Sequence, residues 1–180
     1  MQSLLTAEAY AALHHDEKPT ELVRGKIVDV PYTMPRCGEI CIHIIHALGT
    51  YLESHDFGHL VSNHSAVVTR RNPDTVRGAH VAFYRYEHVR KGLLPWDYLP
   101  VPPGLVFEVL SPTDRWSEVQ VKVAEYLDVS GRAVCVVDDD TRSVHVFRPD
   151  QPMRVFKAAE EFVLPEILSE FRVPVGTYFE

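Results

Sequence analysis

The feature that most restricts the fold is an apolar stretch at residues 105–110, Leu-Val-Phe-Glu-Val-Leu, which a single carboxylate interrupts. A short run that is apolar on both faces predicts a central strand, covered by other elements above and below its sheet. Glu108 is the interruption. Because an isolated charge inside a protein is very costly, Glu108 has to be paired, protonated or bound to a cation.

The rest of the chain predicts helices and strands around this strand. Spacing and capping residues predict helices over residues 6–14 and 38–54. They also predict a third helix, which is capped by residues 111–114 and extends to about residue 130. Alternation and turn residues predict a hairpin at 21–30 and strands at 60–69, 76–84, 132–137, 143–147 and 154–156. A proline-rich loop spans 86–103, and the last apolar segment should close over the core. The sum is an α+β (mixed α/β) sandwich whose helices cover a central sheet.

Composition and charge restrict the class of protein. At 180 residues, with 46% hydrophobic and 24% charged, the chain predicts one domain over residues 1–180. The net charge of −7 argues against a protein that coats nucleic acid, although a local basic cleft stays possible. Three cysteines cannot all pair, and neither a signal peptide nor a membrane-spanning stretch is visible. We expect a cytoplasmic protein without a membrane partner.

Lys122 follows Glu108 in the third predicted helix and is the next candidate for chemistry. The apolar face of that helix is predicted to consist of Trp116, Val119, Val123 and Leu127. Lys122 lies at the border of this face, so its ammonium can reach inward, or it can form an exposed pair with Glu118. A strand carboxylate, a lysine and a second acid are the minimal set for hydrolysing a phosphodiester with a divalent metal. The second acid is expected from residues 76–84.

Six short segments carry a more specific pattern. In chain order they are residues 6–10 (TAEAY), 21–28 (ELVRGKIV), 76–83 (VRGAHVAF), 107–114 (FEVLSPTD), Lys122 to Tyr126, and 136–138 (VVD). Together they resemble the Uma2 family, a group of restriction-endonuclease-like proteins within the PD-(D/E)XK nuclease superfamily. The resemblance implies a restriction endonuclease-like central mixed β-sheet flanked by helices, with an N-terminal helix and hairpin. It covers essentially the whole chain.

The resemblance also implies a site. Glu108, Lys122 and Glu21 would be catalytic, and Glu108, His80 and Glu21 would hold a divalent metal, Mg²⁺ or Mn²⁺. DNA would be the substrate and a homodimer the expected assembly. Two positions depart from the family pattern: Ala79-His80 stands where the family has Pro-Asp, and Cys37 stands where a histidine is common.

The exchange of an aspartate for His80 leaves two hypotheses open. A neutral imidazole binds Mn²⁺, Fe²⁺ or Zn²⁺ but is a poor ligand for Mg²⁺, which prefers oxygen. One hypothesis is therefore a metal-dependent DNA endonuclease that His80 impairs. The other is a catalytically inactive nuclease-fold protein that acts as a DNA-binding or protein-interaction module.

A basic group in the middle of the chain is a candidate DNA contact. Arg70, Arg71 and Arg77 concentrate positive charge around the strands at 60–69 and 76–84, against the acidic overall balance. We predict that they face DNA phosphates beside Glu108. The alternative is ordinary surface charge.

A second group has the composition of a zinc site. Cys37, Cys41, His43 and His46 follow one another within ten residues. On a helix, however, the two cysteines fall near the apolar face and both histidines point to roughly the opposite side. We expect buried thiols and surface imidazoles here rather than a metal site.

Overall fold

The computed structural model describes residues 4–13, 18–129 and 131–180. Its elements are α1 (Ala7–Ala11), β1 (Thr20–Val23), β2 (Lys26–Asp29), α2 (Pro35–Ser54), β3 (Gly58–Arg70), β4 (Thr75–Arg85), β5 (Leu105–Val109), α3 (Trp116–Asp128), β6 (Ala133–Asp138), β7 (Ser143–Arg148), β8 (Gln151–Lys157), β9 (Glu161–Leu164), β10 (Leu168–Pro174) and the 3₁₀-helix η1 (Val175–Phe179). None of the helices within these described ranges is long and apolar enough to cross a membrane.

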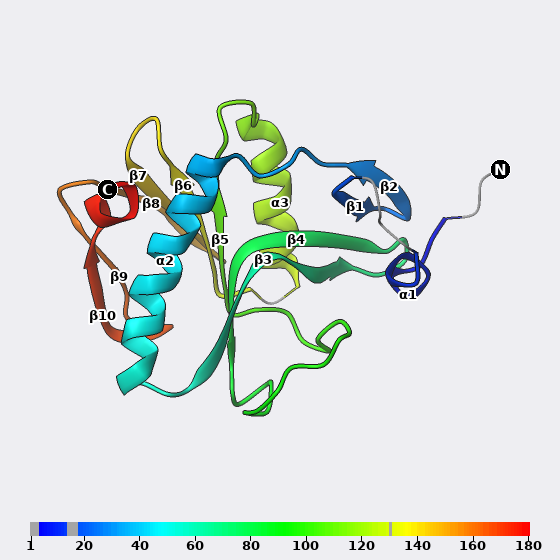
Figure 1. The fold of residues 1–180 in the computed structure, drawn as a ribbon, viewed down its shortest axis with the longest axis horizontal. Coiled ribbons are helices and arrows are strands. Elements are labelled where there is room, and N and C mark those ends of the chain that lie inside the picture. Colours follow the sequence, from blue (N-terminus) through cyan, green and yellow to red (C-terminus); the bar gives the residue numbers. More distant parts are fainter. Residues whose placement is uncertain (1–3, 14–17, 130) are drawn as a thin grey trace.

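The centre of the fold is an eight-stranded mixed sheet. Its strands run in the order β2-β1-β4-β5-β6-β7-β8, with β3 paired to β4 off this path. Strand β5 is antiparallel to β4 and parallel to β6. Figure 1 shows α2 (cyan) and α3 (yellow-green) on either side of the strands around β5. The predicted mixed α/β architecture, a central sheet flanked by helices, is confirmed.

Strand β5 is buried along its whole length, as its apolar run predicts. Because side chains alternate along a strand, Leu105, Phe107 and Val109 pack in the core beneath α2, whereas Val106 packs in the core beneath α3. Glu108 has the same parity as Val106. The alternation therefore places the Glu108 carboxylate on the side of the sheet that α3 covers.

The element boundaries differ from the predicted ones mainly at helix starts. Helix α2 begins at Pro35 instead of residue 38, because proline is tolerated in the first turn of a helix. Helix α3 begins at Trp116, later than predicted, because the Asp114 carboxylate accepts a hydrogen bond from the Ser111 amide in the preceding turn. Thr6 caps α1 as predicted, accepting from the Ala9 amide, but α1 ends at Ala11. The predicted end of that helix, residue 14, lies outside the described residues, as does residue 130.

The C-terminal segment closes over the core beneath α2, as expected, but in a form that was not predicted. Strands β9 and β10 make a separate two-stranded sheet, and η1 follows it. Phe162, Leu168 and Tyr178 from this segment are fully buried in the same core as Ile44 of α2. Figure 1 shows this segment at the end of the molecule opposite α1 and the β1–β2 hairpin.

Candidate active site

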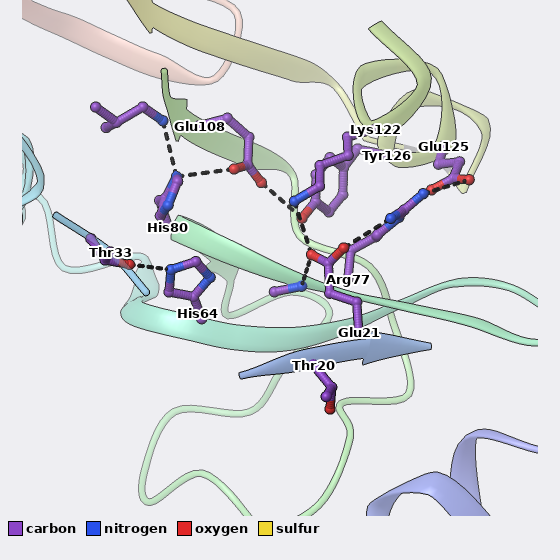
Figure 2. Close-up of polar contacts among 12 residues, drawn as sticks. Thr20, Glu21, Thr33, His64, Arg77, His80, Glu108, Lys122, Glu125 and Tyr126 are labelled. Carbon is purple, nitrogen blue, oxygen red and sulfur yellow. Dashed lines mark hydrogen bonds and ion pairs between the residues drawn. The ribbon is translucent and has the colours of Figure 1, made fainter. Parts of the chain in front are cut away.

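Glu108 meets two side chains on the α3 side of the sheet (Figure 2). The Tyr126 hydroxyl donates to Glu108 Oε1 at 2.9 Å, and Nδ1 of His80 lies 3.0 Å from Glu108 Oε2. Burial raises the pKa of Glu108, but the His80 ring and the Lys122 ammonium outweigh it and bring that pKa below its ordinary value. Of the three alternatives left open for this buried carboxylate, the structure shows a paired one.

His80 occupies an opening in the sheet. The register between β4 and β5 runs only as far as the pair Val81 and Phe107. Beyond that pair, Nδ1 of His80 lies 3.0 Å from the Val109 amide nitrogen, in the place of a backbone acceptor. A neutral ring accepts this amide hydrogen, whereas a protonated ring donates to Glu108 instead. Burial lowers the pKa of His80, but Glu108 and Cys37 outweigh it and raise that pKa to about 10, which favours the protonated ring.

Glu21 is the anchor of a second group. It extends from β1 with a side chain that is 4% exposed. Its Oε1 accepts from Lys122 Nζ at 2.9 Å and from the Gly78 amide at 3.1 Å, and its Oε2 accepts from Arg77 Nη1 at 2.8 Å. Burial raises the pKa of Glu21, but Lys122 and Arg77 outweigh this effect and bring the pKa below its ordinary value, so the carboxylate is ionised. Lys122 thus bonds across the fold to β1 and not to its helical neighbour Glu118.

Arg77 completes this second group and is buried. Its Nε and Nη2 donate to the Glu125 carboxylate at 2.6 and 3.2 Å, while Nη1 binds Glu21. Arg71, in contrast, pairs with Glu8 and Asp74 near α1, and Arg70 is exposed. Of the three arginines predicted to face DNA, Arg77 therefore already has its guanidinium bound by two carboxylates.

The two groups meet at Lys122. Figure 2 shows its ammonium between Glu108 and Glu21. Burial lowers the pKa of Lys122, but both carboxylates raise it above its ordinary value, so the ammonium stays charged. The resulting row alternates in sign and consists of His80, Glu108, Lys122, Glu21, Arg77 and Glu125. With His80 protonated, three cations balance three anions.

The donor atoms fit a divalent metal only in part. Glu108 Oε2 and His80 Nδ1 are 3.0 Å apart, close to the spacing of two adjacent ligands around an ion with bonds of about 2.1 Å. Glu21 does not offer a comparable oxygen, because Lys122, Gly78 and Arg77 occupy both. Within the described ranges, no three or more His, Cys, Asp or Glu residues are placed to hold a metal ion.

Cys37 adds a contact that the sequence did not indicate. Its Sγ lies 3.8 Å from His80 Nε2, at the start of α2. A hydrogen bond from Cys41 and the neighbouring His80 ring, against the effect of burial, lower the pKa of the Cys37 thiol to about 5. Cys37 and His80, the two positions at which the sequence analysis expects a departure from the family pattern, are thus in contact with each other.

The buried thiols and surface imidazoles expected at the start of α2 are found there in part, and His43 is the main exception. Cys37 is buried and Cys41 half-buried, whereas His46 is exposed. His43 is half-buried instead of lying on the surface, and its Nδ1 is 3.2 Å from the Tyr178 carbonyl oxygen. The four side chains do not converge.

Sequence reasoning missed Tyr126 and His64 as members of the site. Tyr126 replaces the predicted Trp116 on the buried face of α3, where Trp116 is 38% exposed. The spacing of four residues from Lys122 was the available signal, because it places both side chains on one face of a helix. His64 stacks edge-on against His80 with ring centroids 4.5 Å apart, and its Nε2 is 2.6 Å from Thr33 Oγ1. The side chain reaches this place because the register of β3 shifts near His64. No local sequence pattern predicts this shift.

Comparisons with known proteins agree with this fold. The family model named Uma2, described as "Putative restriction endonuclease", matches residues 7–176. The structure is similar to the crystal structure of "a putative nuclease belonging to DUF820" from Anabaena variabilis ATCC 29413, with a TM-score of 0.83. The two share 17% sequence identity, and the match covers 97% of each chain, which shows likeness of fold. No curated protein matches the chain.

Proposed function

The chain belongs to the Uma2 family, and on that premise we propose that it is an endonuclease that hydrolyses DNA phosphodiester bonds with the help of a divalent metal. The observation that carries the proposal is the buried Glu108, held 3.0 Å from a second metal-binding side chain, with the Lys122 ammonium on its other side. A carboxylate, a second ligand and a fixed cation are the groups that phosphodiester hydrolysis requires.

Glu108 and His80 are the residues that would hold the metal. A divalent ion bound there would supply an activated water and neutralise the charge of the phosphate. Because one of the two donors is a ring nitrogen, Mn²⁺ suits the pair better than Mg²⁺. The proton of His80 has to leave Nδ1 before that nitrogen can bind an ion, so metal binding releases a proton.

Lys122 is proposed to stabilise the negative charge that develops on the phosphate. Glu21 holds its ammonium in place by a hydrogen bond, and the charges of Glu108 and Glu21 keep it protonated. This geometry supports Glu21 as a positioning residue for Lys122 more than as a metal ligand. Arg77 and the Gly78 amide in turn fix the Glu21 carboxylate. Arg70 and Arg71 remain proposed contacts of the DNA backbone.

One observation favours the second candidate, a catalytically inactive DNA-binding or protein-interaction module. In the alternating row from His80 to Glu125, each charged group has a neighbour of opposite charge without a metal, as long as His80 is protonated. A site of this kind is stable as a purely structural network. The two functions differ in what a metal does.

Plasmid nicking by the purified chain separates the two functions. We expect nicking in Mn²⁺, little in Mg²⁺ and none with a chelator. Glu108→Gln keeps the acceptor for Tyr126 but removes the charge that binds the metal, and should lower the rate by roughly 100-fold or more. Glu118→Gln, an exposed site on the same helix, is the matched control and should cut like the parent. DNA binding without cleavage in either metal would support the inactive module instead.

A further inference from the structure

A large pocket opens beside the candidate active site. It measures about 880 Å³, within the usual range of small-molecule sites. Strands β1, β3 and β4 and the loop of residues 94–99 contribute to its wall. Glu21, Arg77, Gly78 and His64 line it as well, so the pocket shares its wall with the groups around Lys122.

The pocket is rich in aromatic rings. They belong to Tyr10, Tyr32, Tyr84, Trp96 and Tyr98. Trp96 is fully exposed, and Tyr32 is 65% exposed. Large apolar rings exposed together at the mouth of a cavity are typical of binding surfaces, because leaving them in water is unfavourable. The tryptophan lies next to Pro95, and the Asp97 carboxylate bonds the Tyr98 amide, both of which restrict the loop.

We propose that this aromatic pocket binds one unpaired nucleobase of the DNA strand, and that the preferred substrate carries an unstacked or single-stranded nucleotide. This inference rests on the proposed nuclease function and adds the class of its substrate. Both faces of a paired base are covered by its neighbours in the duplex, so only an unpaired base can present a face to Trp96. Aromatic stacking of this kind is tolerant of sequence.

Charges around the pocket fit a nucleotide better than a purely apolar ligand. Lys18 stands at the wall with an exposed ammonium that is 3.6 Å from Asp29, and a surface pair of this kind opens readily to bind a phosphate. His64 lies toward the active site, beside His80. Glu21 lines the pocket and also binds Lys122, so a base in the pocket would bring its phosphate toward the site where the chemistry is proposed.

The two tryptophans of the chain make the test specific. Trp116→Phe leaves Trp96 as the only tryptophan, and Trp116 lies on α3 outside the pocket. Binding is measured by anisotropy of labelled oligonucleotides in a chelator, so that no cleavage interferes. The probes are a paired duplex, the same duplex with a one-nucleotide bulge, and the same bulge with an abasic site.

We expect the base-containing bulge to bind roughly tenfold more tightly than the other two probes, and to quench Trp96 fluorescence. Trp96→Ala should remove the tenfold difference, Trp96→Phe should retain most of it, and Trp116→Phe should behave as the parent. Equal affinity for the base-containing and abasic bulges, or a preference that survives Trp96→Ala, would overturn the proposal. So would binding of free adenosine monophosphate as tight as that of the bulge.

This outcome is separable from the outcome for the nuclease. Preference for the bulge without cleavage in Mn²⁺ would refute the proposed function and leave the base pocket standing. Cleavage in Mn²⁺ that is equally fast on all three probes, with equal affinities, would refute the base pocket alone.

Discussion

At the scale of single residues, the choice of metal in the proposed nuclease depends on His80. Its ring enters the opening between β4 and β5. One ring nitrogen faces Glu108 and the other faces Cys37. An aspartate at the same position would add a charge and oxygen donors, and would lose the proton that now neutralises Glu108. The identity of this one side chain therefore couples the choice of metal to the charge balance of the site.

We expect His80→Asp to raise Mg²⁺-dependent nicking by roughly tenfold or more over the parent protein, because Mg²⁺ prefers oxygen ligands. The ratio of rates in Mg²⁺ and Mn²⁺ is the measurement, since it is insensitive to the fraction of folded protein. His64→Asp, which places the same acid on the neighbouring ring position, is the control. An unchanged ratio in His80→Asp would show that residue 80 does not bind the metal.

At the scale of elements, α3 is tied to β1 and β4 by the ion pairs of Glu21, Arg77, Lys122 and Glu125. Glu21 and Lys122 are 101 residues apart in sequence, and Arg77 and Glu125 are 48 apart. These contacts follow from the sheet order, in which β1 pairs with β4, and not from any local spacing.

We predict that Arg77→Leu destabilises the fold by about 3–5 kcal/mol, because it leaves the buried Glu21 and the largely buried Glu125 without their shared cation. Urea unfolding measures the effect. Arg172→Leu breaks an exposed pair with Glu161 and should cost less than about 1 kcal/mol. Similar losses in the two variants would contradict a structural role for the buried network.

The features that the sequence predicts well are those that depend on residues close together in the chain. The buried strand at residues 105–110, the hairpin and the helix at 38–54 are set by local patterning, and they were predicted with small errors at their ends. The partner of Lys122 was left open, because helical spacing shows the nearby Glu118 and hides the distant Glu21. Strands β9 and β10 were missed because their short apolar segments show no pattern typical of a strand. Packing against the core beneath α2, which is not visible in the local sequence, stabilises them.

At the scale of the whole molecule, two main cores lie on opposite faces of one sheet. The positive side chains close to Glu21 are bound within the fold. The net charge is −7, and Lys122 and Arg77 are already paired with Glu21 within the fold. Few positive side chains are left near the site to meet a DNA backbone. Recognition should then depend on local contacts and not on a broad basic field.

A weak dependence on salt is the expected result. Proteins that contact 6–10 phosphates lose about 10³–10⁵ in affinity between 50 and 200 mM salt, whereas about three contacts predict a loss of roughly 40-fold. The affinity for the bulged oligonucleotide, measured in a chelator at several salt concentrations, gives the slope. A loss above about 10³-fold would mean that a basic surface outside this site carries the binding.

The contact between Cys37 and His80 has a consequence for substitutions at either position. The resemblance to the family places a histidine and an aspartate at these positions, and the chain carries a thiol and an imidazole, 3.8 Å apart. Because the two side chains are in contact, an exchange of one changes the surroundings of the other. An aspartate at residue 80 would therefore enter surroundings shaped for a ring beside sulfur, and its effect depends on which side chain residue 37 carries.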